Sequence, residues 1–221
     1  MKISKIAKIL PIALALSLCG VNAADFTADS GSTEATVNYT LTLDDFVKIT
    51  TDDASKVVTA GSSYHTDYGS IRMDKSLQTT FTVISNAEQR KVNLAASCPG
   101  GTNAIKHVSD TTFELVFGNS DHEPDQNSIN NILGNAVEAD SNANAISFLV
   151  TLTPTREHGP NASTAIKSTA WVDDHIEYTI QNGHTTLPYV VATDNQPNTF
   201  NTQDMSGTYT ATLTMTDGGA I

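Results

Sequence analysis

Strict alternation of hydrophobic and polar residues predicts a β-strand near the start of the chain. From Glu34 to Leu43 the apolar residues occupy every second position. Successive side chains of a strand point to opposite faces, so this segment has one apolar face that something must cover. Its five apolar residues are Ala35, Val37, Tyr39, Leu41 and Leu43. Burying each of the four larger side chains would contribute about 1.5–3 kcal/mol.

The far end of the chain, 208–216, repeats this alternation, and shorter stretches of the same kind lie between the two ends. Polar turns separate these stretches, which is typical of an all-β sandwich with about eight to ten short strands. No repeat of solenoid or propeller length occurs. The predicted strands are 34–43, 46–49, 56–59, 79–84, 92–96, 113–117, 146–152, 176–180, 187–191 and 208–216.

Two pairs of these strands are predicted to form hairpins. The first joins 79–84 to 92–96 across a polar loop, and the second joins 176–180 to 187–191 across Asn182-Gly183. Asn-Gly between two alternating runs is a strong hairpin signal.

A helical pattern is predicted within the polar stretch 119–145. Five apolar residues behind Asn127 and Ser128 are spaced as on one helix face, and Gly134 weakens the pattern. They are Ile129, Ile132, Leu133, Ala136 and Val137.

The first 23 residues have the pattern of a secretory signal peptide. Three lysines precede an apolar run, and Ala23 ends a small-x-small cleavage site. We therefore predict three parts: a signal peptide at 1–23, an N-terminal extension at 24–44 and a β-sandwich domain at 45–221. Lipidation at Cys19 is an alternative, although Leu18 before it fits such a site poorly.

Charge and hydropathy exclude several partners. Without the signal peptide, nine basic residues face 24 acidic residues, a net charge of −15. Such a surface repels phosphate backbones and anionic lipids, so neither nucleic acid nor a membrane surface is an expected partner. After the signal peptide no apolar stretch is long enough to span a bilayer. Cys98 is then the only cysteine left, and we expect it to be buried rather than paired between chains.

Candidate catalytic and metal-binding residues are scattered. Asp174 and His175 have the residue types of a hydrolase site, but no nucleophile motif accompanies them. The acidic stretch 121–127 lacks the EF-hand pattern, so a plain acidic loop competes with a calcium site. We expect solvated loop positions for the histidines rather than metal ligation, and we expect no enzyme. These histidines are His107, His122, His158, His175 and His184.

At its two ends the sequence resembles the major subunit of bacterial fimbriae, specifically the alpha-type chaperone–usher pilins. The stretch 34–49, an alternating strand followed by Asp44-Asp45 and a second strand, is similar to their N-terminus. The stretch 81–96 is similar to the family's next hairpin, and 206–215 resembles its Gly-x-Tyr ending. That ending also resembles spore-coat-U-like secreted domains.

The resemblance implies an incomplete immunoglobulin-like β-sandwich that is completed by a donor strand from a neighbouring subunit. Val37, Tyr39, Leu41 and Leu43 would fill the neighbour's groove. It further implies a secreted structural subunit of a cell-surface fimbria, used in adhesion or biofilm. Its partners would be identical subunits in a filament, a periplasmic chaperone and an outer-membrane usher. The alternative is a self-contained secreted β-sandwich that binds a glycan or protein ligand, with 34–43 as its own first strand.

Overall fold

The computed structural model describes residues 37–53, 55, 76–134, 144–158, 167–172, 174–195 and 204–221, with 156–158, 167–171 and 194–195 described by their backbone alone. Every strand pairing in these ranges is antiparallel, and the prediction of an all-β fold is confirmed. The elements are β1 (Val47–Thr51), β2 (Leu77–Ser97), β3 (Ile105–Ser109), β4 (Thr112–Asn119), α2 (Gln126–Leu133), β5 (Ala145–Leu152), β6 (Thr155–His158), β7 (Lys167–Val172), β8 (His175–Asn195), β9 (Tyr209–Thr210) and β10 (Thr212–Ala220).

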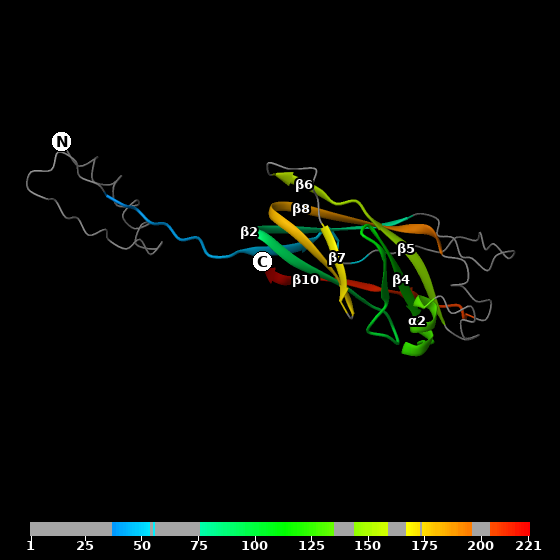
Figure 1. Cartoon of the computed structure of the whole chain (residues 1–221). Coiled ribbons are helices and arrows are strands. Elements are labelled where there is room, and N and C mark those ends of the chain that lie inside the picture. Colours follow the sequence, from blue (N-terminus) through cyan, green and yellow to red (C-terminus); the bar gives the residue numbers. More distant parts are fainter. Residues whose placement is uncertain are drawn as a thin grey trace, which may run out of the picture. The chain divides into compact units, whose positions relative to one another are not determined.

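Two strands of 21 residues each, β2 and β8, form the centre of the sheet (Figure 1). They pair along most of their length, from Leu77 opposite Val191 to Ala95 opposite His175. Beyond β8 follow β5, β4 and β3, while β6 and β7 pair with two other parts of β8. Since β8 occupies one edge of β2, the other edge is left to β1 and β10.

Both predicted hairpins are wrong, because the arms of each pair with a different strand. The stretch 79–84 pairs with the second half of β8, and residues 92–95 pair with its first half. The register between β2 and β8 shifts between Ser85 and Gln89, opposite Gly183, whose φ of 111° suits glycine. The two polar stretches that were predicted as hairpin loops are therefore bends within β2 and β8. Figure 1 shows the sharp turn of β8.

The bend lets one strand enclose the core from two sides. Tyr178 and Tyr189 lie 11 positions apart on β8, which would separate them by roughly 36 Å in a straight strand. Instead both side chains are buried in the same hydrophobic core. The ring of Tyr189 also packs edge-on against Phe81 and Phe113, at 5.9 and 5.7 Å between centroids.

The predicted short helix is confirmed as α2 over its first part, and the predicted positions Ala136 and Val137 lie outside the described residues. Its N-cap is Asp125, whose carboxylate accepts a hydrogen bond of 2.7 Å from the Ser128 N–H. The helix ends before Gly134, and its buried face, including Ile129 and Ile132, packs on β4 and β5. No helix within the described residues has the length and apolar character needed to cross a membrane.

The contacts divide the chain into two units between Asp44 and Asp45. The predicted signal peptide, the residues 24–36 of the extension and the strand 56–59 lie outside the described residues. Residues 37–46 of the chain lie in no strand. In its described part, 37–43, the alternating segment thus differs from the prediction of a strand, because it pairs with no other described strand.

Candidate functional site

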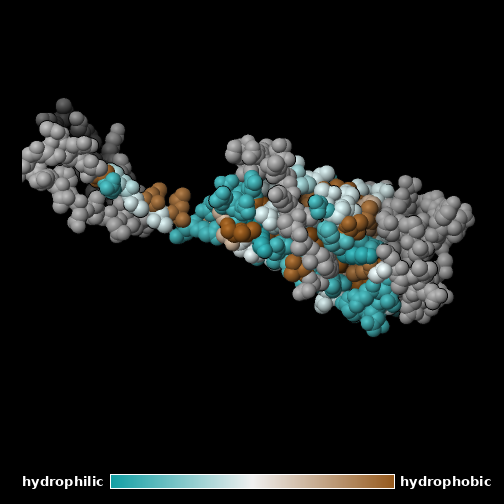
Figure 2. All heavy atoms as spheres, viewed as in Figure 1, coloured by the Kyte–Doolittle hydropathy of each residue, from teal (hydrophilic) through white to brown (hydrophobic). Residues whose placement is uncertain are grey.

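The four residues predicted to fill a neighbour's groove have exposed side chains. Val37 is 42 % exposed, Leu41 66 %, Leu43 77 % and Tyr39 83 %. Hydrophobic and hydrophilic residues alternate on the surface of this segment (Figure 2). We call 37–43 the apolar segment. Four large hydrophobic side chains in so short a stretch are unusual on a protein surface unless they serve an interaction.

The domain begins and ends on one edge of β2. From Val47 opposite Ser85, β1 runs antiparallel to β2, and β10 does the same up to Ala220 opposite Arg90. The two strands therefore run in the same direction and in line, β10 first and β1 next. Their ends meet at the bend, where the Ile221 N–H donates to the Gln89 carbonyl at 3.0 Å.

β10 has a buried face, an exposed face and one edge that pairs with no other described strand. Met215 is buried and Leu213 is half-buried. The threonines that alternate with them, Thr212, Thr214 and Thr216, are exposed. Among the described strands its one partner is β2. Its second edge therefore presents main-chain N–H and C=O groups that another strand could pair with.

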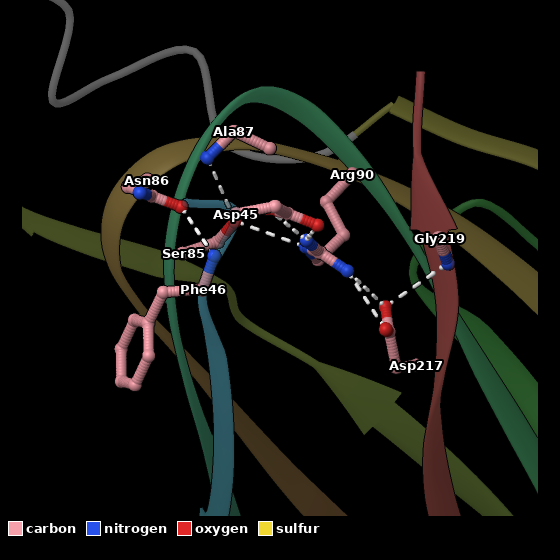
Figure 3. Close-up of polar contacts among 8 residues, drawn as sticks. All are labelled: Asp45, Phe46, Ser85, Asn86, Ala87, Arg90, Asp217 and Gly219. Atoms are coloured by element: carbon pink, nitrogen blue, oxygen red, sulfur yellow. Dashed lines mark hydrogen bonds and ion pairs between the residues drawn. The ribbon is translucent and has the colours of Figure 1, made fainter. Parts of the chain in front are cut away.

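Arg90 holds the meeting point of β1 and β10 together (Figure 3). Its side chain, 1 % exposed, lies on the same face of β2 as the core residues Val92 and Leu94. The guanidinium donates to both carboxylate oxygens of Asp217 on β10, at 2.6 and 2.7 Å, and to both oxygens of Asp45 before β1. Its Nε donates to the Ser85 hydroxyl at 3.0 Å.

Further hydrogen bonds fix the backbone around Arg90. The Phe46 N–H donates to the Asn86 side-chain oxygen at 2.7 Å, and the Asn86 N–H donates back to the Phe46 carbonyl at 3.3 Å. The Gly219 N–H donates to the Asp217 carboxylate at 3.0 Å. The bend of β2, the start of β1 and the end of β10 thus share one polar network, which we call the Arg90 clip.

The electrostatics of the Arg90 clip favour its charged form. Hydrogen bonds to Asp45 and then to Asp217 raise the pKa of Arg90 against the opposing effect of burial. Burial raises the pKa of Asp217, but the hydrogen bonds from Arg90 and Gly219 outweigh it, so that pKa is lowered. A buried guanidinium is tolerated here because it is paired with carboxylates.

A second network holds the Gly-x-Tyr ending. The Tyr209 hydroxyl donates to the Met205 carbonyl at 2.7 Å, four residues upstream. A Cβ on Gly207 would lie 2.5 Å from the side chain of Asn119, which is fully buried, so this contact requires glycine. The network leads the chain from β9, paired with β4, to β10, paired with β2.

The remaining candidates form no evident site in the described part. Asp174 and His175 hydrogen-bond to each other at 2.9 Å, with the Asp174 side chain 73 % exposed. Within the acidic stretch 121–127, Asp125 serves as the cap of α2. Within the described residues no three histidine, cysteine or acidic side chains gather as metal ligands. For His158 the structure describes the backbone alone.

The prediction that Cys98 is buried is confirmed. Burial raises the pKa of its thiol to about 11, which makes it a poor nucleophile at neutral pH.

Sequence reasoning missed the Arg90 clip, although it recognised Asp44-Asp45 as a break between two strand-like pieces. Arg90 lies 45 positions from Asp45 and 127 from Asp217, and no local pattern connects such positions. The one signal was a lone arginine followed by Val92 and Leu94 on the same strand face. Comparisons with protein-family models, curated proteins and solved structures find no match to this chain.

Proposed function

We propose that the protein is a secreted structural subunit of a fimbria or similar surface filament, assembled by donor-strand exchange. The apolar segment of one subunit would complete an immunoglobulin-like sandwich in the next. The observation that carries the proposal is that Val37, Tyr39, Leu41 and Leu43 alternate, are exposed and lie in no strand, directly before a domain that begins at Asp45.

Physical chemistry supports a strand as the bound form. Adding a strand to an open edge satisfies main-chain hydrogen bonds, and the alternate side chains then enter one groove. Burial of the four side chains would contribute about 1.5–3 kcal/mol each, before the cost of ordering the segment. The open edge of β10 is the acceptor we propose, since its buried residues also alternate with threonines.

The direction of β1 supports exchange between subunits. If the chain before Val47 continued the line of β1 along β2, it would reach the stretch from Arg90 onward. That stretch is already paired with β10. A subunit's own apolar segment therefore has no place on β2 in this direction. A head-to-tail contact that does not close on itself produces a filament, which fits a shaft subunit.

Chaperone, usher and cell-surface location follow from the resemblance to alpha-type pilins. A subunit with an open edge and an exposed apolar segment would aggregate during export unless another protein covers them. A periplasmic chaperone followed by an outer-membrane usher would meet that need.

The test is an unheated detergent gel of the exported protein beside a heated one. We expect a ladder of multiples that collapses on heating and is missing in Leu41→Asp, because a carboxylate cannot enter an apolar groove. Thr40→Asp is the matched control: it adds the same charge on the other face of the strand and should keep the ladder.

A single monomer band in every lane would overturn the proposal. The alternative, a self-contained secreted β-sandwich that binds a glycan or protein ligand, would then be tested by ligand screening.

A further inference from the structure

The Arg90 clip joins two regions that the proposed assembly uses separately. Asp45 is the first residue of the domain after the apolar segment, and Asp217 lies on β10, whose second edge pairs with no described strand. Each carboxylate receives two hydrogen bonds from the same guanidinium.

We propose that Arg90 couples Asp45 and Phe46, which follow the apolar segment and which we call its root, to the end of β10 around Asp217. An ordered root would then stabilise the end of β10, and an ordered end of β10 would stabilise the root. Asp45 and Asp217 both pair with this buried guanidinium. Removal of either carboxylate therefore leaves part of its positive charge without a counter-charge. Losing one carboxylate leaves Arg90 less well compensated and free to reorient. The chain segment that carries the remaining carboxylate is then held less firmly as well.

Two backbone hydrogen bonds around the Arg90 clip provide readouts of the coupling, one at each of the two chain segments that Arg90 joins. At the root, the Phe46 N–H donates to Asn86. At the other end, the Ile221 N–H donates to Gln89. Asn86 and Gln89 both lie in the bend of β2, between Ser85 and Arg90, so both amides report on the same short stretch from opposite sides.

This coupling deepens the proposed function and rests on it for its biological role. A subunit whose apolar segment is seated in a neighbour has an ordered root. Through Arg90 it would then hold its own β10 more firmly as a template for the next segment. Because coupling free energies are reciprocal, a filled β10 edge would order the root to the same extent. Growth from an existing filament would thus be favoured over pairing of free subunits.

The test is amide hydrogen exchange on the monomeric full chain, with Leu41→Asp present in every sample to prevent assembly. We expect Asp217→Asn to accelerate exchange of the Phe46 amide, and Asp45→Asn to accelerate that of Ile221. Each change should be at least about tenfold, the lower end for losing hydrogen bonds to a charged group. Glu177→Gln is the control, since it removes the partner of the neighbouring Lys91 and should change neither amide.

Two results would overturn the coupling. One is that each variant accelerates only the amide at its own end. The other is that both variants accelerate the core amide of Leu94 equally, which would indicate global unfolding. Asp217→Glu guards against the second case, because it keeps the carboxylate and should restore slow exchange at Phe46. The exchange result does not depend on a gel ladder, so the coupling and the filament proposal can fail separately.

Discussion

The apolar segment and β10 have nearly the same sequence pattern and opposite environments. In each, threonines alternate with apolar residues, as in Thr40-Leu41-Thr42-Leu43 and Thr212-Leu213-Thr214-Met215. Leu213 and Met215 are half-buried and buried against β2, whereas Leu41 and Leu43 are exposed. Alternation therefore determines which side chains share a face, and the presence of a partner strand determines whether that face is buried.

The largest effect should come from placing the same charge in the two regions. Met215→Asp puts a carboxylate into the core and should lower the free energy of unfolding by at least about 3 kcal/mol. Leu43→Asp should change it by less than about 0.5 kcal/mol, because its side chain is already exposed. Urea denaturation of the monomer measures both. An equal loss in the two variants would mean that the segment is an internal strand of the domain.

The second largest effect should be the pH dependence of stability, which should change with a substitution on β10 and not with one in the apolar segment. The folded-state pKa of Asp217 lies below its ordinary value of 3.8. Its contribution to stability is therefore present above that value and is lost as the pH falls through the lowered pKa. Asp217→Asn should be less stable than the wild type at neutral pH and should approach it as the pH falls below 3.8 and through the lowered pKa.

Urea midpoints measured across this pH range test the acid response. Leu43→Asp, which leaves the Arg90 clip intact, should instead follow the wild-type curve. A constant gap between Asp217→Asn and the wild type would contradict the role given to the Asp217 carboxylate.

The smallest effect concerns the polar faces. Thr214→Ala removes a β-branched residue from a paired strand and should cost a few tenths of a kcal/mol, up to about 1. Thr42→Ala should leave the unfolding of the monomer unchanged and lower the temperature at which a gel ladder collapses. If Thr42→Ala destabilises the monomer as much as Thr214→Ala, the two regions are equivalent and the contrast fails.

The faces of the strands could be predicted from sequence, but their partners could not. Val92 and Leu94 on β2, like Ile176 and Tyr178 on β8, alternate in the sequence and are buried in the structure. On β4 the pattern is misleading, because Glu114 and Val116 are buried as well as Phe113 and Leu115. Asn182-Gly183 gave the place of a bend correctly and the pairing wrongly, because a neighbouring strand of 21 residues binds both arms. Hydrogen bonding between strands is non-local, so local pattern cannot select between these outcomes.

One part of the candidate site could likewise be predicted from the sequence, and the other could not. Val37, Tyr39, Leu41 and Leu43 could be named from their alternation alone. The Arg90 clip could not, since its three charged members come from distant parts of the chain and each is ordinary in its local context.

The placement of the termini has a consequence for how the gene could be rearranged. Because β10 ends where β1 begins, on the same edge and in the same direction, a short linker from Ile221 to Asp45 would make one continuous strand. The domain would then be a closed loop of chain, open to new ends at an exposed turn such as Thr111. The apolar segment is attached where these two strands meet, so it could be lost, lengthened or exchanged without interrupting any described strand of the sheet.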